Sequence, residues 1–166
     1  MQAELDPNQE QPLPGLILIA TDASPAAAKA VEVGLELAAA RASNVVFVHF
    51  SAAARPLFDA HPEAGPSQAE IEAADPVLRA AADAARVRAI QFTLKLHGAE
   101  HAAGDIAAAL AGMASGLDAS MIVLGTRGHG AIASAVLGSV SRTLLSFSSV
   151  PVVVVHPGDD QARSVD

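Results

Sequence analysis

From residue 15 onward, short apolar runs alternate with longer segments whose apolar residues recur at helical spacing. The apolar runs predict five strands, at Leu16–Ala20, Val45–Phe50, Ile90–Leu96, Met121–Gly125 and Val152–His156. The segments between them predict helices at Pro25–Arg41, Pro76–Arg88, Asp105–Gly116 and Gly138–Phe147. This alternation is typical of a parallel sheet covered by helices. We therefore expect an α/β fold: one doubly wound domain with a five-stranded parallel sheet in the order 3-2-1-4-5 and helices on both faces.

Local signals refine three of these elements. Ser24 is placed to cap the first helix, and Pro25 suits its first helical position. Polar and apolar residues alternate over 90–96, which predicts an edge strand with one wetter face. Residues 51–75 contain several prolines and no regular period, so the pattern does not predict their structure.

The length of 166 residues fits a single domain. We expect this domain to span residues 14–157, between flexible ends at 1–13 and 158–166. The apolar runs are far shorter than the roughly 18 residues of a membrane span, and the start carries only acidic charges. The sequence therefore predicts no membrane insertion and a cytoplasmic location.

Composition excludes several classes of chemistry. The chain has no cysteine, which excludes disulfides, thiolate metal sites and cysteine nucleophiles. The net charge is −8, and there are no Trp or Tyr residues and five Phe. Because nucleic-acid binding usually needs a basic surface and aromatic rings for stacking, we expect no nucleic-acid partner.

A glycine-rich segment follows the predicted fourth strand. It reads Gly125-Thr126-Arg127-Gly128-His129-Gly130, and Gly138-Ser139 follows where the last helix begins. Backbone N–H groups approach an anion closely where no Cβ intervenes, and a helix N-terminus adds free N–H groups. Asp22 follows the first strand, which neighbours the fourth in the expected order. This pairing suits a ligand with ribose hydroxyls near the carboxylate and phosphates near the glycines.

The spacing Gly125-x-x-Gly128, nine residues and then Gly138-Ser139 resembles the nucleotide loop of the universal stress protein family, in its ATP-binding branch. The resemblance covers residues 16–156. It includes Ala20-Thr21-Asp22, Val48-His49, Gly104-Asp105 and Val150-Pro151-Val152. Two positions depart from the family pattern: Ala23 stands where glycine is frequent, and Ser120 stands where aspartate is common.

The resemblance implies ATP as the bound cofactor, with room for Mg²⁺ to bridge its phosphates. Asp22 would hold ribose or adenine, while Val48 and the backbone of Ala20 and Leu124 would line the base pocket. The phosphates and ribose would be held by Gly125, Gly128, Gly138, Ser139, Val140 and Ser141. The resemblance also implies a homodimer in which the fifth strands meet, through the apolar edge formed by Val152, Val153, Val154 and Val155.

Other interpretations of these residues remain open. The glycines could simply permit tight turns, and Asp22 could serve the dipole of the first helix. Arg127 and His129 could contact phosphate or form an exposed pair. His97 and His101 have the spacing of metal ligands only within a helix, and Gly98 favours a loop.

An efficient enzyme is not indicated. The lysines are Lys29 and Lys95, and neither lies in the loop, which excludes the G-x-x-x-x-G-K phosphate loop. Ser139 also lacks the surroundings of a hydrolase nucleophile. The sequence thus predicts a stress-linked regulatory or sensing module with at most slow ATP hydrolysis. The alternatives are the same fold acting through an unidentified protein partner without nucleotide, or an ATP-using hydrolase-like enzyme.

Overall fold

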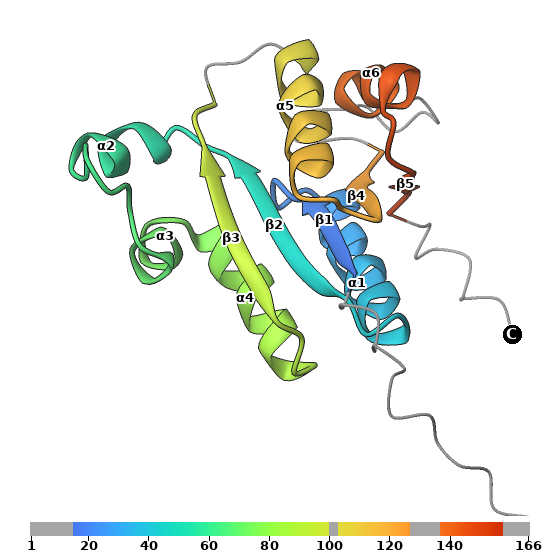
Figure 1. Cartoon of the computed structure of the whole chain (residues 1–166), viewed down its shortest axis with the longest axis horizontal. Coiled ribbons are helices and arrows are strands. Elements are labelled where there is room, and N and C mark those ends of the chain that lie inside the picture. The colour runs from blue at the N-terminus through green and yellow to red at the C-terminus, as the bar shows by residue number, and fades with distance from the viewer. Residues whose placement is uncertain (1–14, 100–102, 127–136, 158–166) are drawn as a thin grey trace, which may run out of the picture.

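The computed structural model describes residues 15–99, 103–126 and 137–157, and it contains a five-stranded parallel sheet (Figure 1). The strand order is β3-β2-β1-β4-β5, which confirms the expected order. The strands are β1 (Leu16–Ala20), β2 (Asn44–Phe50), β3 (Phe92–His97), β4 (Met121–Gly125) and β5 (Val152–Val155). The helices are α1 (Pro25–Ala40), α2 (Ala54–Asp59), α3 (Gln68–Ala74), α4 (Pro76–Val87), α5 (Ala103–Gly116) and α6 (Ser139–Phe147).

Each face of the sheet has its own hydrophobic core, because successive side chains of a strand point to opposite faces. Ile17, Ile19 and Phe47 pack with α1 and α4 on one face. Leu18 and Ile122 pack with α5 and α6 on the other. All five of these side chains are fully buried. The helices therefore cover both faces, as the doubly wound fold requires (Figure 1).

Three helices end in a left-handed residue that is not glycine. Ala42, Ala89 and Asp118 follow α1, α4 and α5 with φ of 48°, 54° and 51°. Each turn closes with a pair of backbone hydrogen bonds; after α4, the N–H of Ala89 donates to Arg86 O and that of Ile90 to Ala85 O. This is the Schellman motif, in which glycine is the usual residue. The chain thus leaves helices α1, α4 and α5 by the same strained turn.

Residues 51–75, whose structure the sequence pattern does not predict, contain α2 and α3. The N-terminus of α3 is a capping box in which Ser67 Oγ accepts from the Glu70 N–H and the Glu70 carboxylate accepts from the Ser67 N–H. The sequence signal for it, Ser67-x-x-Glu70, was present but too short to predict a helix alone. Arg86 of α4 holds α3 through two hydrogen bonds of 2.7 Å to the Glu72 carboxylate.

A buried carboxylate joins α3, α4 and β2. Asp75 is 1% exposed and lies between the two helices. Its Oδ1 accepts the Leu78 N–H at 2.8 Å, and its Oδ2 lies 2.9 Å from His49 Nδ1. Asp75 therefore caps α4 and attaches it to the end of β2.

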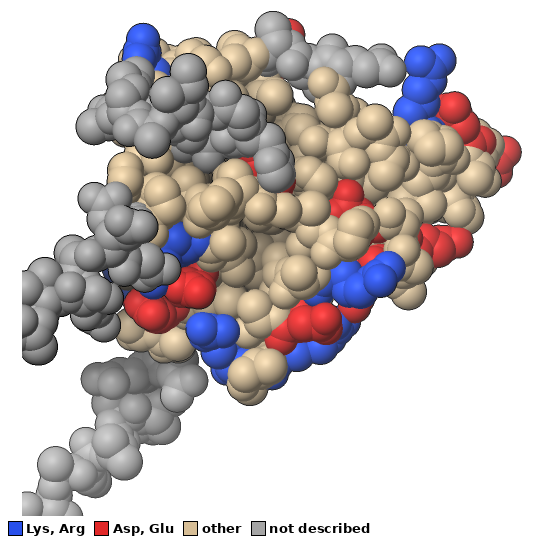
Figure 2. Space-filling view, turned by 180° about the vertical axis from the view of Figure 1, so that it is seen from behind, with Lys and Arg blue, Asp and Glu red and all other residues tan. Residues whose placement is uncertain are grey.

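Acidic and basic side chains adjoin on the face shown in Figure 2. Lys29 pairs with Glu32, and Arg86 pairs with Glu72 and Asp83. Because most of these side chains are about half exposed, each pair makes only a modest contribution to stability. Among the described residues, no helix combines the length and apolar character needed to cross a membrane.

Candidate functional site

The carboxyl ends of β1 and β4 lie side by side at the centre of the sheet. The two strands pair in parallel, with Leu18 opposite Ile122 and Ile19 opposite Val123. Asp22 follows β1 by two residues, and Gly125 is the last residue of β4. The strand order reverses between these strands, which is where ligands bind in open α/β sheets.

Asp22 is half-buried in the turn from β1 to α1. Its Oδ1 accepts the N–H of Ser24 at 3.0 Å, and Ser24 Oγ in turn accepts the Ala27 N–H as the cap of α1. Between them, Ala23 has a φ of 62°, a conformation that glycine adopts more easily. The positive φ at this position thus explains why glycine is frequent there in the family. A carboxylate offers about four acceptor positions, so Asp22 retains capacity for ligand hydroxyls beside its role in the turn.

Packing against α1 leaves no room for a side chain at Gly125. A Cβ at this position would lie 2.7 Å from the carbonyl carbon of Ala26 and 2.8 Å from the backbone nitrogen of Ala27. The first turn of α1 therefore passes directly against the end of β4. This contact brings the turn that holds Asp22 towards Gly125, and it would be needed even without a ligand.

The start of α6 closes the loop that begins after β4. The N–H of Gly138 donates to the carbonyl of Thr126, and Gly138 is the N-cap of α6 with no side chain to satisfy the first turn. The first N–H groups of a helix have no partner within the helix, so this end of α6 is suited to an anion. Ser139 is exposed here and Val140 is half-buried.

Ser141 and Thr126 carry buried hydroxyls at the end of β4. Ser141 is 2% exposed, and its Oγ donates to the carbonyl of Gly125 at 2.9 Å. Ser141 therefore links α6 to β4, and its hydroxyl proton is already used in this hydrogen bond. Thr126 Oγ1 is buried and has no hydrogen-bond partner within the described part of the chain. Thr126 is not among the site residues predicted from the sequence, although a hydroxyl directly after Gly125 is a signal for it.

The three predicted base-pocket residues share the face covered by α5 and α6. Val48 and Leu124 are 1% and 4% exposed, while Ala20 is half-buried. The carbonyl of Val48 accepts the N–H of Thr21 at 2.9 Å. Contact with a ligand would therefore be made mainly around Ala20 and the adjoining backbone.

Three predicted residues, Arg127, Gly128 and His129, lie outside the described residues, as does His101. His97 is the last residue of β3, not part of a helix, and its ring stacks on Phe50 with centroids 5.3 Å apart. Within the described ranges, no group of three or more His, Asp or Glu side chains is placed to hold a metal ion.

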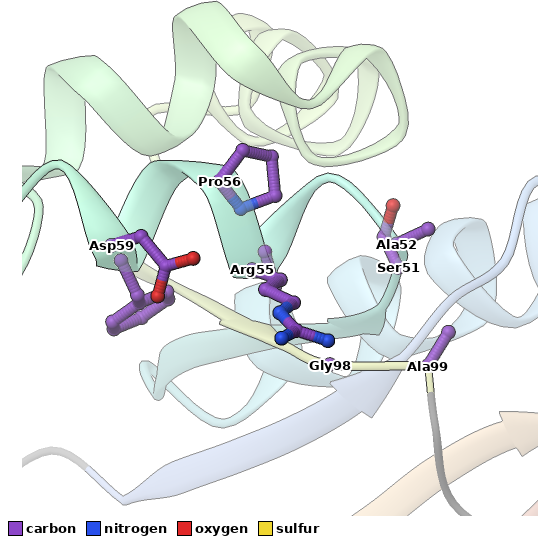
Figure 3. A pocket seen from close by; sticks show the side chains of 9 residues that line it. Ser51, Ala52, Arg55, Pro56, Asp59, Gly98 and Ala99 are labelled. Atoms are coloured by element: carbon purple, nitrogen blue, oxygen red, sulfur yellow. The ribbon is translucent and has the colours of Figure 1, made fainter.

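A separate pocket of about 390 Å³ lies between α2 and the end of β3 (Figure 3). Its lining includes Arg55, Phe58 and Asp59 of α2, and Gly98 and Ala99 after β3. None of the residues predicted to bind nucleotide contributes to it. The pocket is therefore separate from the β1–β4 site and lies where β2 and β3 end.

The fold and the site define a doubly wound α/β domain with a glycine-containing loop at the point where the strand order reverses. The model of the universal stress protein family matches residues 15–156, and the chain belongs to this family. A universal stress protein of Mycolicibacterium smegmatis is 59% identical over 44 residues, which are 26% of this chain and 15% of that relative. The match thus spans a small part of the relative's own length.

Solved structures share the fold over most of the chain. A universal stress protein family member from Burkholderia pseudomallei has a TM-score of 0.59 and 26% identity, covering 87% of this chain and 96% of that one. A universal stress protein in complex with cAMP has a TM-score of 0.60, 24% identity and coverage of 87% and 98%. The protein from Archaeoglobus fulgidus in complex with dAMP has a TM-score of 0.58, 21% identity and coverage of 86% and 97%.

Proposed function

We propose that this protein binds an adenine nucleotide, ATP, at the carboxyl ends of β1 and β4, with Mg²⁺ bridging the phosphates. It acts as a regulatory or sensing module in a stress response. The ribose lies against Asp22, and the phosphates lie against the start of α6 and the glycine loop. In this arrangement the ribose hydroxyls donate to the Asp22 carboxylate, and the negatively charged phosphates accept from backbone N–H groups.

The observation that carries this proposal is the convergence of Asp22, Gly125 and the α6 N-terminus. The β1–β4 pairing, the contact of Gly125 with α1 and the Ser141 hydrogen bond bring them together. The buried Thr126 hydroxyl adds an unsatisfied polar atom at the same place, and such atoms are rare without a partner. The cAMP and dAMP bound to two proteins of the same fold support the ligand class.

A binding role fits the described residues better than efficient catalysis. Phosphoryl transfer needs cationic groups and metal-holding carboxylates around the phosphates. Lys29 is exposed and pairs with Glu32 on α1, and Lys95 is exposed on β3. Arg142, near the start of α6, donates to the Leu137 carbonyl at 3.4 Å, and the described residues hold no group of three acidic or His side chains placed for a metal ion. Any ATP hydrolysis is therefore slow, and a phosphate-release assay should give turnover near background. Repeated turnovers would instead favour the ATP-using enzyme.

Titration calorimetry with ATP tests the site, using Asp22→Asn and the control Asp118→Asn. Asn at residue 22 retains an oxygen for the Ser24 N–H, so the turn is kept while the charge is lost. Asp118 is exposed in the turn before β4, at the opposite ends of the strands from Asp22. A charge-assisted hydrogen bond contributes about 1.5–3 kcal/mol, so Asp22→Asn should weaken binding by roughly tenfold or more. No binding by the wild type would favour action through a protein partner alone.

We also propose a homodimer in which the β5 strands of two copies meet. Val152, Val153 and Val154 are half-buried on an edge strand with an uncharged surface. Apolar edge strands promote pairing with another chain unless they are covered. Size-exclusion chromatography with light scattering should give twice the chain mass of 16.7 kDa. A monomer at micromolar concentration would contradict the dimer.

A further inference from the structure

The sheet has two edges, and the backbone of β3 forms one of them. The N–H of Val45 donates to Gln91 O and that of Ser51 to His97 O. The backbone N–H and C=O groups of the odd-numbered residues in 91–97 therefore point towards β2. Parallel ladders alternate, and the peptide groups of Phe92, Leu94 and Leu96 therefore point away from β2. Such outward groups form a template for pairing with a further strand.

The side chain of Gln68 occupies the middle of these three positions. Gln68 Nε2 donates to the carbonyl of Leu94 at 3.1 Å, and Gln68 Oε1 accepts the Leu94 N–H at 2.6 Å. A side-chain amide carries the same donor and acceptor as a peptide group. Gln68 thus makes with Leu94 the two hydrogen bonds that a neighbouring strand would make.

Several contacts hold Gln68 in this place. It is the first residue of α3, directly after the capping-box residue Ser67. Ile71 anchors the helix in the core and is 5% exposed. From α4, Arg86 pairs with Glu72 and lies 5.2 Å from the centroid of the Phe92 ring, beside Leu94. The position of Gln68 is therefore set by three contacts of α3 and not by its own amide alone.

The β5 edge differs from the β3 edge. Ile122 donates to Pro151 O and Thr126 to Val155 O, so the same alternation directs Val152 and Val154 outward. In the described ranges, no side chain forms a hydrogen bond with the outward peptide groups of these two valines. Among the described residues, one edge of the sheet is thus paired with a side-chain amide, whereas the other is paired with no side chain.

We propose that Gln68 blocks strand pairing at the β3 edge, so that self-association of this chain is confined to the β5 edge. The partner that Gln68 excludes is the β3 strand of a second copy. Without the amide, the Leu94 N–H and C=O lose their partners in α3, and a β3 strand that displaces the first turn of α3 can pair with them. The chain then gains a second association surface. This proposal is independent of nucleotide binding.

Light scattering of Gln68→Leu tests it, with Gln91→Leu as the matched control. Both changes convert a glutamine near β3 to leucine, but Gln91 is exposed and precedes the strand. At equal concentration, Gln68→Leu should at least double the mean mass of the wild type, whether the wild type is a monomer or a dimer. Gln91→Leu should keep the wild-type mass. A folded Gln68→Leu protein with wild-type mass, or an equal rise in both variants, would overturn the proposal.

Hydrogen exchange at the Leu94 amide provides a second readout, at a dilution where Gln68→Leu has the wild-type mass. Loss of the Gln68 acceptor should accelerate exchange of this amide by tenfold or more, while amides that face β2, such as Thr93, stay protected. An unchanged Leu94 rate would overturn the proposal. If Gln68→Leu does not fold, Gln68→Ala against Gln91→Ala applies the same criteria with a smaller apolar change.

Discussion

Gly125→Ala adds one methyl group where α1 meets the end of β4. The new Cβ would lie 2.7 Å from the Ala26 carbonyl carbon, 2.8 Å from the Ala26 Cβ and 2.8 Å from the Ala27 nitrogen. Ordinary carbon contacts are about 3.5–4.0 Å, so the backbone of α1 must move by nearly 1 Å. No side-chain rotation relieves this contact, because two of the three atoms belong to the helix backbone.

The cost of this movement follows from what α1 buries. Seven α1 residues are buried, including Ala30 and Leu35 at 0% exposure. Overpacking of a dense core costs typically 1–3 kcal/mol, and a clash with helix backbone belongs at the upper end. We therefore expect Gly125→Ala to lower the free energy of unfolding by about 3 kcal/mol.

Urea unfolding followed by far-ultraviolet circular dichroism measures this change. The chain has no Trp or Tyr, so its intrinsic fluorescence is a poor probe. With a urea dependence of about 2 kcal/mol per molar, a loss of 3 kcal/mol lowers the midpoint by roughly 1.5 M. Protein concentration must be equal for all variants, because dimerisation contributes to apparent stability.

Gly112→Ala provides the matched control. Gly112 lies within α5, and an added Cβ there would have no heavy atom within 4 Å. Alanine is favoured over glycine in a helix interior by roughly 1 kcal/mol, so this variant should be more stable than the wild type. The same chemical change is thus expected to have opposite signs at the two positions. A Gly125→Ala protein as stable as the wild type would refute the packing argument.

Three further predictions concern stability. Ser141→Ala should lower the free energy of unfolding by about 1 kcal/mol, because the carbonyl of Gly125 loses a hydrogen bond. An unchanged urea midpoint would count against this contact. Ala89→Gly should raise the free energy of unfolding by about 0.5–1 kcal/mol, because a φ of 54° is strained for alanine. A lower melting temperature would contradict the assigned turn. Hydrogen bonds from Arg86 hold the pKa of Glu72 below its usual value of 4.5, so the pair adds stability above that pH and loses it as the pH falls through the lowered pKa. In melting curves between pH 7 and 3, Glu72→Gln should therefore lie below the wild type at neutral pH and converge with it in acid, and a constant difference would be inconsistent with this linkage.

The fold was predictable because its signals are local and repeated. Each buried strand is a short apolar run, and Ser24-Pro25 marks the start of α1 as the structure has it. Given the strand order, the rule that ligands bind where the order reverses places the candidate site between β1 and β4. The register of β1 with β4 places Asp22 and Gly125 at the carboxyl ends of adjacent strands.

The excursion between β2 and α4 was less predictable, because its helices have six and seven residues and depend on tertiary contacts. The bond between Asp75 and His49 spans 26 residues, and so does the pairing of Gln68 with Leu94. No sequence period reports contacts at such a separation. The packing role of Gly125 was hidden for the same reason, since it depends on where α1 passes in space.

The central claim is that an adenine nucleotide binds where β1 and β4 end. The most direct test is to denature the purified protein and analyse the supernatant chromatographically for adenine nucleotides, with Gly138→Val prepared in parallel. Gly138 has φ of −61° and ψ of 160°, a conformation that valine also adopts, so this change adds bulk at the α6 N-terminus without backbone strain. The account predicts near-stoichiometric nucleotide in the wild type and its loss in the variant. A wild-type protein that is empty and also fails to bind added ATP would contradict it.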